Sequence, residues 1–138
     1  MLKGIPAVIS PELMFRLMNM GHGEEILLAD ADFPAGKHPH VLRADGIGVE
    51  TLLEAVLPFF PLDGFVERPA IVMDCSPWGD EPESYGRYRK SLKKHHPKFS
   101  DLEQLERFEF YRRAEACCCI VITGEPDGNL ILKKGPVM

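Results

Sequence analysis

The sequence predicts an α/β fold, in which helices flank a mostly parallel central sheet. Three short runs, Ile26–Ala29, Ala70–Met73 and Ala116–Ile122, are continuously apolar, as in strands that are buried on both faces. Segments with helical spacing alternate with these runs, which is the pattern of strand–helix–strand units. We therefore expect one domain over residues 1–138, with the three runs as neighbouring strands.

Local signals place helices between the predicted strands. Ser10 can cap the first helix, Pro11 suits its first position, and Gly21 stands where a left-handed residue would end it. The lysine- and arginine-rich segment 85–96 is predicted to form an exposed helix with a basic face. The remaining elements that we predict are helices at residues 49–57 and 108–116 and strands at residues 41–42 and 130–132.

Charge and hydropathy exclude several kinds of partner. The net charge is −5 and no basic block is present, which argues against nucleic acid, because phosphate binding needs a clustered basic face. No apolar run approaches the ~18 residues of a membrane span. The N-terminal segment lacks the long apolar core of a secretory signal, so we expect a cytoplasmic protein.

The four cysteines are Cys75, Cys117, Cys118 and Cys119. Three adjacent cysteines suit neither a spaced disulfide framework nor the usual spacing of metal ligands. We interpret the triplet as buried strand residues with poorly reactive thiols in a reducing compartment. A thiol or metal protein that combines the triplet with histidines remains a competing hypothesis. The histidines concerned are His38, His40, His95 and His96.

Candidate chemistry gathers around the first predicted strand. His22 lies between Gly21 and Gly23, which favours a sharp and open turn, and Asp30 and Asp32 follow the strand. Ligands of open α/β sheets bind outside the carboxyl ends of strands, so we expect the imidazole and the carboxylates near one pocket mouth. The alternative interpretation is a solvated turn histidine followed by surface acids.

Several motifs, in order along nearly the whole chain, resemble the fucose mutarotase and ribose pyranase family of sugar-anomer enzymes. The Gly-His-Gly turn and the Thr123-Gly124-Glu125 segment are similar to the fucose branch. The other matching motifs are Ser10-Pro11-Glu12-Leu13, Asp30-Ala31-Asp32-Phe33-Pro34, Arg43-Ala44-Asp45-Gly46, Arg107-Phe108, Phe110-Tyr111 and Gly128-Asn129.

The resemblance implies an activity, a site and an assembly. It implies a mutarotase that interconverts the α and β anomers of a free monosaccharide, L-fucose or a related sugar, without metal or cofactor. It implies that His22 is the proton donor and that Asp30, Arg107 and the tripeptide Asp127-Gly128-Asn129 bind the sugar. It also implies a homo-oligomer, with a decameric ring as one form and with sugar sites at or near subunit contacts.

Elementary chemistry agrees with these roles. Anomer exchange needs a proton delivered to the ring oxygen and another removed from the anomeric hydroxyl, and histidine is the side chain whose unperturbed pKa, ~6.5, lies nearest to working pH. Asp30 could orient His22 or bind a hydroxyl, Arg107 carries several fixed donors, and Asn129 offers a donor and an acceptor. The sequence has no glycine-rich nucleotide motif, so we expect no nucleotide cofactor.

Two questions stay open from the sequence. The family often has a tyrosine where this chain has Asp127, and the preceding turn is shorter here, so the pocket contacts and any pyranose–furanose exchange are undetermined. The second question is catalysis itself. A non-catalytic monosaccharide-binding accessory protein linked to sugar transport would show the same pocket and no effect on the exchange rate.

Overall fold

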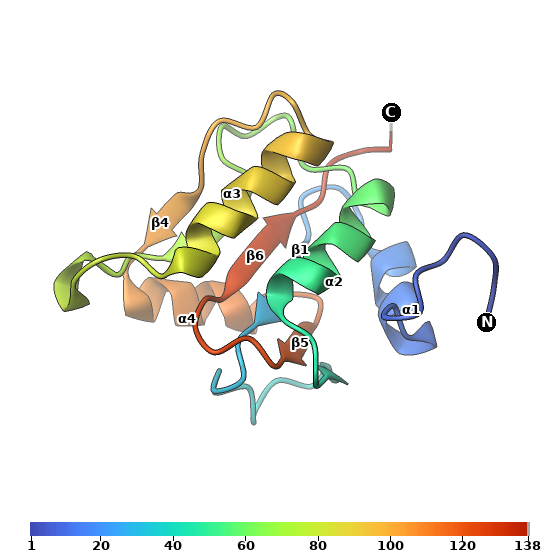
Figure 1. The fold of residues 1–138 in the computed structure, drawn as a ribbon, viewed down its shortest axis with the longest axis horizontal. Helices are drawn as coiled ribbons and strands as arrows, with labels where there is room; N and C mark the ends of the chain where they lie inside the picture. The colour runs from blue at the N-terminus through green and yellow to red at the C-terminus, as the bar shows by residue number, and fades with distance from the viewer. Residues whose placement is uncertain (138) are drawn as a thin grey trace.

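A six-stranded sheet organises the chain in this computed structural model, which describes residues 1–137 (Figure 1). The strand order is β2-β5-β1-β6-β3-β4. The strands are β1 (Glu25–Ala29), β2 (Val41–Ala44), β3 (Ala70–Met73), β4 (Glu103–Leu105), β5 (Ile120–Thr123) and β6 (Leu130–Lys133). The helices are α1 (Pro11–Asn19), α2 (Val49–Val56), α3 (Glu83–His95) and α4 (Arg107–Glu115), with 3-10 turns η1 (Leu57–Phe59) and η2 (Ser76–Trp78).

The sheet is mostly parallel, as the sequence predicts. Strand β1 pairs in parallel with β5, and β5 in parallel with β2, while β3 pairs in parallel with β4. Only β6 among the described strands runs the other way, pairing antiparallel with β1 on one side and β3 on the other. The connection from β5 to β6 covers residues 124–129, which is too short for a parallel crossover, so the chain has to turn back.

This return strand corrects one prediction. We expected the first, third and fifth strands to be neighbours, but β6 lies between β1 and β3. Ile131 of β6 faces Leu27 of β1 and also Ile71 of β3. The run Leu130–Leu132 is fully buried, but a run of three apolar residues is too short to indicate a central strand from the sequence.

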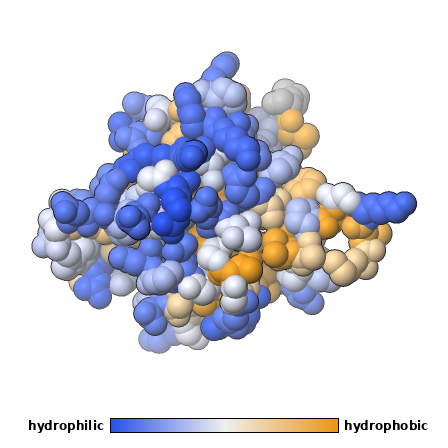
Figure 2. All heavy atoms as spheres, viewed as in Figure 1, coloured by the Kyte–Doolittle hydropathy of each residue, from blue (hydrophilic) through white to orange (hydrophobic). Residues whose placement is uncertain are grey.

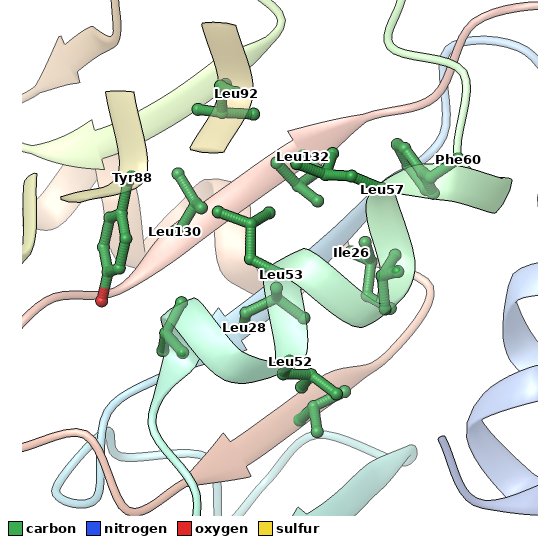
Figure 3. Packing of buried hydrophobic residues seen from close by; sticks show 14 of the residues in the cluster. Ile26, Leu28, Leu52, Leu53, Leu57, Phe60, Tyr88, Leu92, Leu130 and Leu132 are labelled. Carbon is green, nitrogen blue, oxygen red and sulfur yellow. The ribbon is translucent and has the colours of Figure 1, made fainter. Parts of the chain in front are cut away.

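Helices cover the two faces of the sheet unequally. Helices α1, α2 and α3 pack on one face, where Ile26 and Leu28 of β1 meet Leu53 of α2 and Leu92 of α3 (Figure 3). The alternate residue Leu27 points to the other face and joins a smaller cluster with α4. The face viewed in Figure 2 is largely hydrophilic, and its apolar side chains gather on the α1 side. No helix within residues 1–137 combines the length and the apolarity needed to cross a bilayer.

The predicted helices are present, with corrected ends. The Ser10 side chain accepts a hydrogen bond from the Leu13 N–H at 3.1 Å, which confirms the predicted cap of α1. The helix ends in an extended residue, Met20, and the left-handed glycine of this region is Gly23 (φ +88°), not Gly21. Helix α3 is less exposed than we predicted, because one face, which includes Tyr85, is fully buried.

The cysteine triplet lies before a strand, not within it. Strand β5 begins at Ile120, so Cys117–Cys119 form the connection from α4. The thiols of Cys117 and Cys119 are buried, and this burial raises the pKa of both, to about 12 for Cys119. Cys118 is half-buried, and its thiol donates to the Glu24 carboxylate at 3.4 Å. Desolvation is also the main reason that its pKa is raised, so all three thiols favour the protonated form.

Candidate functional site

A four-residue turn presents His22 at the amino end of β1. The Glu24 N–H donates to the Gly21 carbonyl at 3.2 Å, and the Glu24 carboxylate accepts from the Gly21 N–H at 2.6 Å. The Gly23 N–H donates to the Lys134 carbonyl at 2.7 Å, which fastens the turn to the exit of β6. The His22 side chain is 48% exposed, so the imidazole stands on a fixed backbone but can still meet a ligand.

Asp63 is the carboxylate that orients this imidazole. His22 Nε2 lies 3.1 Å from Asp63 Oδ1, and only 4% of the Asp63 side chain is exposed. The same oxygen accepts from the Phe65 N–H at 3.0 Å, and the Phe65 ring lies 5.3 Å from the imidazole centroid. With Nε2 held by a carboxylate, Nδ1 is the ring nitrogen available to exchange protons with a ligand.

Of the two roles that the sequence left open for Asp30, orienting the His22 imidazole is therefore taken by Asp63 within this chain. Asp63 stands in an Asp-Gly pair, which is typical of a turn and carries no sign of a site, and it follows His22 by 41 residues. It reaches the imidazole because its own N–H donates to the Lys133 carbonyl at 3.0 Å, beside the His22 turn. No local motif carries that pairing, so only the sheet order reveals it.

At the carboxyl end of β1, Asp30 lies in a cradle of hydrogen-bond donors. Its Oδ2 accepts from the Gly128 N–H at 3.2 Å and from Asn129 Nδ2 at 3.1 Å, and its Oδ1 accepts from the Asp32 N–H at 3.1 Å. Asn129 Oδ1 in turn accepts from the Asp30 N–H at 2.8 Å. Burial raises the pKa of Asp30 above the ordinary aspartate value, and the Gly128 and Asp32 N–H groups partly oppose that rise.

The path of the chain explains why Asp30 meets the tripeptide. Strand β1 lies between β5 and β6, so the 124–129 connection has to cross the carboxyl end of β1. Thr123 Oγ1 donates to the Ala29 carbonyl at 2.8 Å, and the Ala31 N–H donates to the Glu125 carbonyl at 2.9 Å. These bonds hold the crossing chain directly over the residue that follows β1.

Arg107 and Asp127 lie near this end without bonding to Asp30. Arg107 begins α4, and its Nε donates to the Tyr111 hydroxyl at 3.2 Å. The Tyr111 ring packs 5.7 Å from the ring of Phe33, in the loop that follows Asp30. Asp127 is exposed, and its backbone carbonyl, not its side chain, is the group held inside the fold.

The structure separates His22 from Asp30. His22 precedes β1, and Asp30 follows it, with Glu25 opposite Lys133 at one end and Leu28 opposite Leu130 at the other. Five residues at ~3.3 Å each make β1 roughly 16 Å long. The imidazole and the carboxylates that we expected near one pocket mouth are therefore apart within this chain, because the turn and the strand exit are at opposite ends of the same strand.

The competing metal hypothesis finds little support in the histidine contacts. His38 Nε2 lies 2.9 Å from the Cys117 carbonyl, and its Nδ1 accepts from the His40 N–H at 3.0 Å. His40 Nδ1 lies 2.9 Å from an Arg16 nitrogen, a cationic neighbour that disfavours a metal ion. Within the described part of the chain, no three His, Cys, Asp or Glu side chains converge as a metal site would require.

The fold and these groups are those of an α/β protein with one site for general acid–base chemistry and one for binding a polar small molecule. One end of β1 carries an imidazole–carboxylate pair that can transfer protons, and the other carries polar groups that suit a hydroxyl-bearing small molecule.

The chain belongs to the RbsD / FucU transport protein family, whose model matches residues 3–137. Fucose mutarotase of Mus musculus is 50% identical to it over 144 residues, which cover 97% of this chain and 94% of the mouse protein. The crystal structure of FucU from Bifidobacterium longum superposes with a TM-score of 0.92 at 40% identity and covers 99% of this chain and 100% of that one. The fucose mutarotase from Streptococcus pneumoniae, solved in complex with L-fucose, has a TM-score of 0.90, 40% identity and the same coverage. The fold class and the family resemblance predicted from the sequence are both confirmed.

Proposed function

We propose that this chain is a cofactor-free sugar mutarotase, which interconverts the α and β anomers of free L-fucose or a closely related monosaccharide. The observation that carries the proposal is the half-exposed His22 imidazole held through Nε2 by the buried Asp63 carboxylate. Its support from relatives is the mouse protein named fucose mutarotase and the Streptococcus pneumoniae enzyme with L-fucose bound.

The reaction needs two proton transfers and no change in composition. The protonated His22 imidazole gives a proton to the ring oxygen, the anomeric hydroxyl gives its proton to a water molecule, and the C1–O5 bond breaks to leave an aldehyde and a hydroxyl. The aldehyde end rotates, and the same hydroxyl closes on its other face while the protons return. Asp63 holds the imidazole in place through Nε2 while Nδ1 gives and takes back the proton.

Sugar binding falls to the other end of the strand. Asp30 presents carboxylate oxygens whose positions are fixed by Gly128 and Asn129, and Arg107, which follows β4, offers guanidinium donors at the same end of the sheet. In this proposal the tripeptide contributes through its backbone and Asn129, since Asp127 replaces the family tyrosine and turns its side chain outward.

A homo-oligomer would bring the two ends together. The ~16 Å length of β1 exceeds what one monosaccharide can bridge, so we propose that the His22 end of one copy faces the Asp30 end of the next. Such a head-to-tail contact closes into a ring when its rotation permits, and a decameric assembly of rings is the form that the family resemblance implies. A cytoplasmic location is part of the same proposal, in line with four free cysteines.

Saturation-transfer NMR tests the function directly. Irradiating one anomeric proton of equilibrated L-fucose should reduce the signal of the other anomer when the protein is present. D-ribose and other free sugars, run in parallel, would define the substrate range and show whether furanose forms exchange. Binding of L-fucose with no transfer above the buffer rate would instead favour the accessory-protein hypothesis.

A further inference from the structure

Two buried hydroxyls of α3 hold the backbone of the sugar-binding tripeptide. Ser84 Oγ donates to the Asp127 carbonyl at 2.7 Å, and the Tyr88 hydroxyl donates to the Gly128 carbonyl at 2.7 Å. Ser84 is 2% exposed and Tyr88 is fully buried, so neither hydroxyl has water to replace a lost partner. Figure 3 shows the Tyr88 hydroxyl directed toward the chain that enters β6.

The tripeptide needs such support because its backbone is unusual. Gly128 has a φ of +132°, a conformation that residues with a side chain rarely adopt. A Cβ at this position would lie 2.3 Å from Ser84 Oγ and 3.0 Å from the Tyr88 hydroxyl. The side chains of α3 therefore contact the backbone of Gly128 so closely that only a residue without a Cβ fits there.

The other side of the same peptide segment faces Asp30. The Gly128 N–H and Asn129 Nδ2 both donate to Asp30 Oδ2, at 3.2 and 3.1 Å. The α3 hydroxyls thus hold the carbonyls of the segment while its N–H groups hold the carboxylate. Burial raises the pKa of Tyr88 well above its ordinary value, so this hydroxyl stays protonated and remains a donor.

We infer that Ser84 and Tyr88 are positioning residues for sugar binding, acting through the Asp127–Asn129 backbone on Asp30. This inference rests on the proposed function of the Asp30 end as the sugar-binding end. It assigns α3 a part in the site, although neither hydroxyl needs to touch the sugar. It also accounts for Asp127, since the carbonyl that Ser84 holds is present whatever side chain the position carries.

The test compares Ser84→Ala and Tyr88→Phe with Ser91→Ala. Ser91 is also a buried serine of α3, at 4% exposure, but it lies two turns further along the helix, beside Glu54. All three changes remove one hydroxyl and should cost similar thermal stability. Only Ser84→Ala and Tyr88→Phe should weaken L-fucose binding, by roughly three- to tenfold, the range of a single hydrogen bond. The exchange rate at saturating sugar should change little, so the loss should appear in KM and not in kcat.

Two further readouts make the outcome decisive. The amide signal of Gly128 should shift in NMR spectra of Ser84→Ala and Tyr88→Phe and stay in place in Ser91→Ala. Asp127→Ala should raise the sugar Kd less than Ser84→Ala does. Unchanged Kd values in both α3 variants would overturn the inference. Failure of the wild-type protein to accelerate exchange would count against the proposed function instead, while titration of L-fucose would still decide the role of the two hydroxyls.

Discussion

The two ends of β1 carry functional groups that differ in exposure and in the number of hydrogen bonds that hold them. At the amino end, the His22 imidazole is nearly half exposed and rests on one carboxylate, Asp63. At the carboxyl end, the Asp30 carboxylate is buried and accepts three hydrogen bonds, two of them from the backbone. A group that transfers protons must be able to reach its ligand and change charge, whereas a group that binds hydroxyls works best when it is held still. The same short strand carries both kinds of group, one at each end.

The largest effect should follow removal of the imidazole. His22→Ala should lower the exchange rate by roughly 10²- to 10⁴-fold, the contribution of a general acid–base group, and leave the fold intact because the ring is half exposed. Saturation-transfer NMR gives the rate, and thermal unfolding gives the stability. His40→Ala is the matched control, since His40 is exposed and contacts Arg16. An unchanged rate in His22→Ala would remove the proton-transfer role of the amino end.

Neutralising Asp63, the partner of the His22 imidazole, should have the second-largest effect on the exchange rate. Asp63→Asn should lower kcat by about tenfold or more, but less than His22→Ala, because the ring remains but loses the carboxylate that holds its Nε2 in place. Asp45→Asn is the control, as Asp45 pairs with Arg43 on the surface. If Asp63→Asn altered only KM, the carboxylate would belong with the binding groups and the contrast between the ends would fail.

Asp30 should affect binding more than turnover. Because burial raises its pKa, Asp30 loses its charge at a higher pH than an ordinary aspartate, so the KM for L-fucose should rise as the pH falls through that raised value. Asp30→Asn should remove this acidic limb of the KM profile. The pH dependence of folding stability runs the other way. Because the folded-state pKa of Asp30 is raised, its contribution to the free energy of unfolding is fully present below the unfolded-state pKa and is lost as the pH rises through the folded-state pKa. A KM profile of the same shape in Asp30→Asn would contradict the assignment.

The smallest effect concerns the cysteines beside the amino end of β1, where the Cys118 N–H donates to the Glu25 carbonyl at 2.8 Å. The thiols of Cys117 and Cys119 should react slowly with a thiol reagent in the native protein, since burial keeps both protonated. Cys118 should react faster than its neighbours but still below the rate of a free cysteine. Counting labelled thiols by mass spectrometry against time checks this order. Immediate labelling of all three would show that this connection opens readily.

The sequence predicts the elements of this fold better than their neighbours. Periodicity and capping signals locate the helices, and apolar runs locate the buried strands, because both depend on residues close in the chain. The insertion of β6 between β1 and β3 depends on how a six-residue connection crosses a strand, which no local pattern records. The triplet Cys117–Cys119 is apolar enough for a strand, but in the structure it belongs to the connection between α4 and β5.

The site shows the same limit. His22 and Asp30 are conspicuous in the sequence because each stands beside a turn or a strand end. Their closeness in sequence suggested one pocket, but β1 lies between them and holds them apart. Asp63, Ser84 and Tyr88 give no signal in the sequence, since each contacts a residue more than 35 positions away in the chain. Residues that carry a motif were visible in the sequence, and residues that hold the motif in place were not.

Subunit mixing tests most directly whether two copies share each site. His22→Ala and Asp30→Ala would be prepared separately, mixed in equal amounts, unfolded together and refolded. The exchange of L-fucose anomers would then be measured by saturation transfer at a sugar concentration well below the wild-type KM, where loss of either group lowers the rate. If the His22 end of one copy meets the Asp30 end of the next, random assembly restores both groups at about one quarter of the contacts, so about a quarter of the wild-type rate should return. If each site lies within one chain, every chain in the mixture carries a defect, and the mixture would stay as inactive as the separate variants.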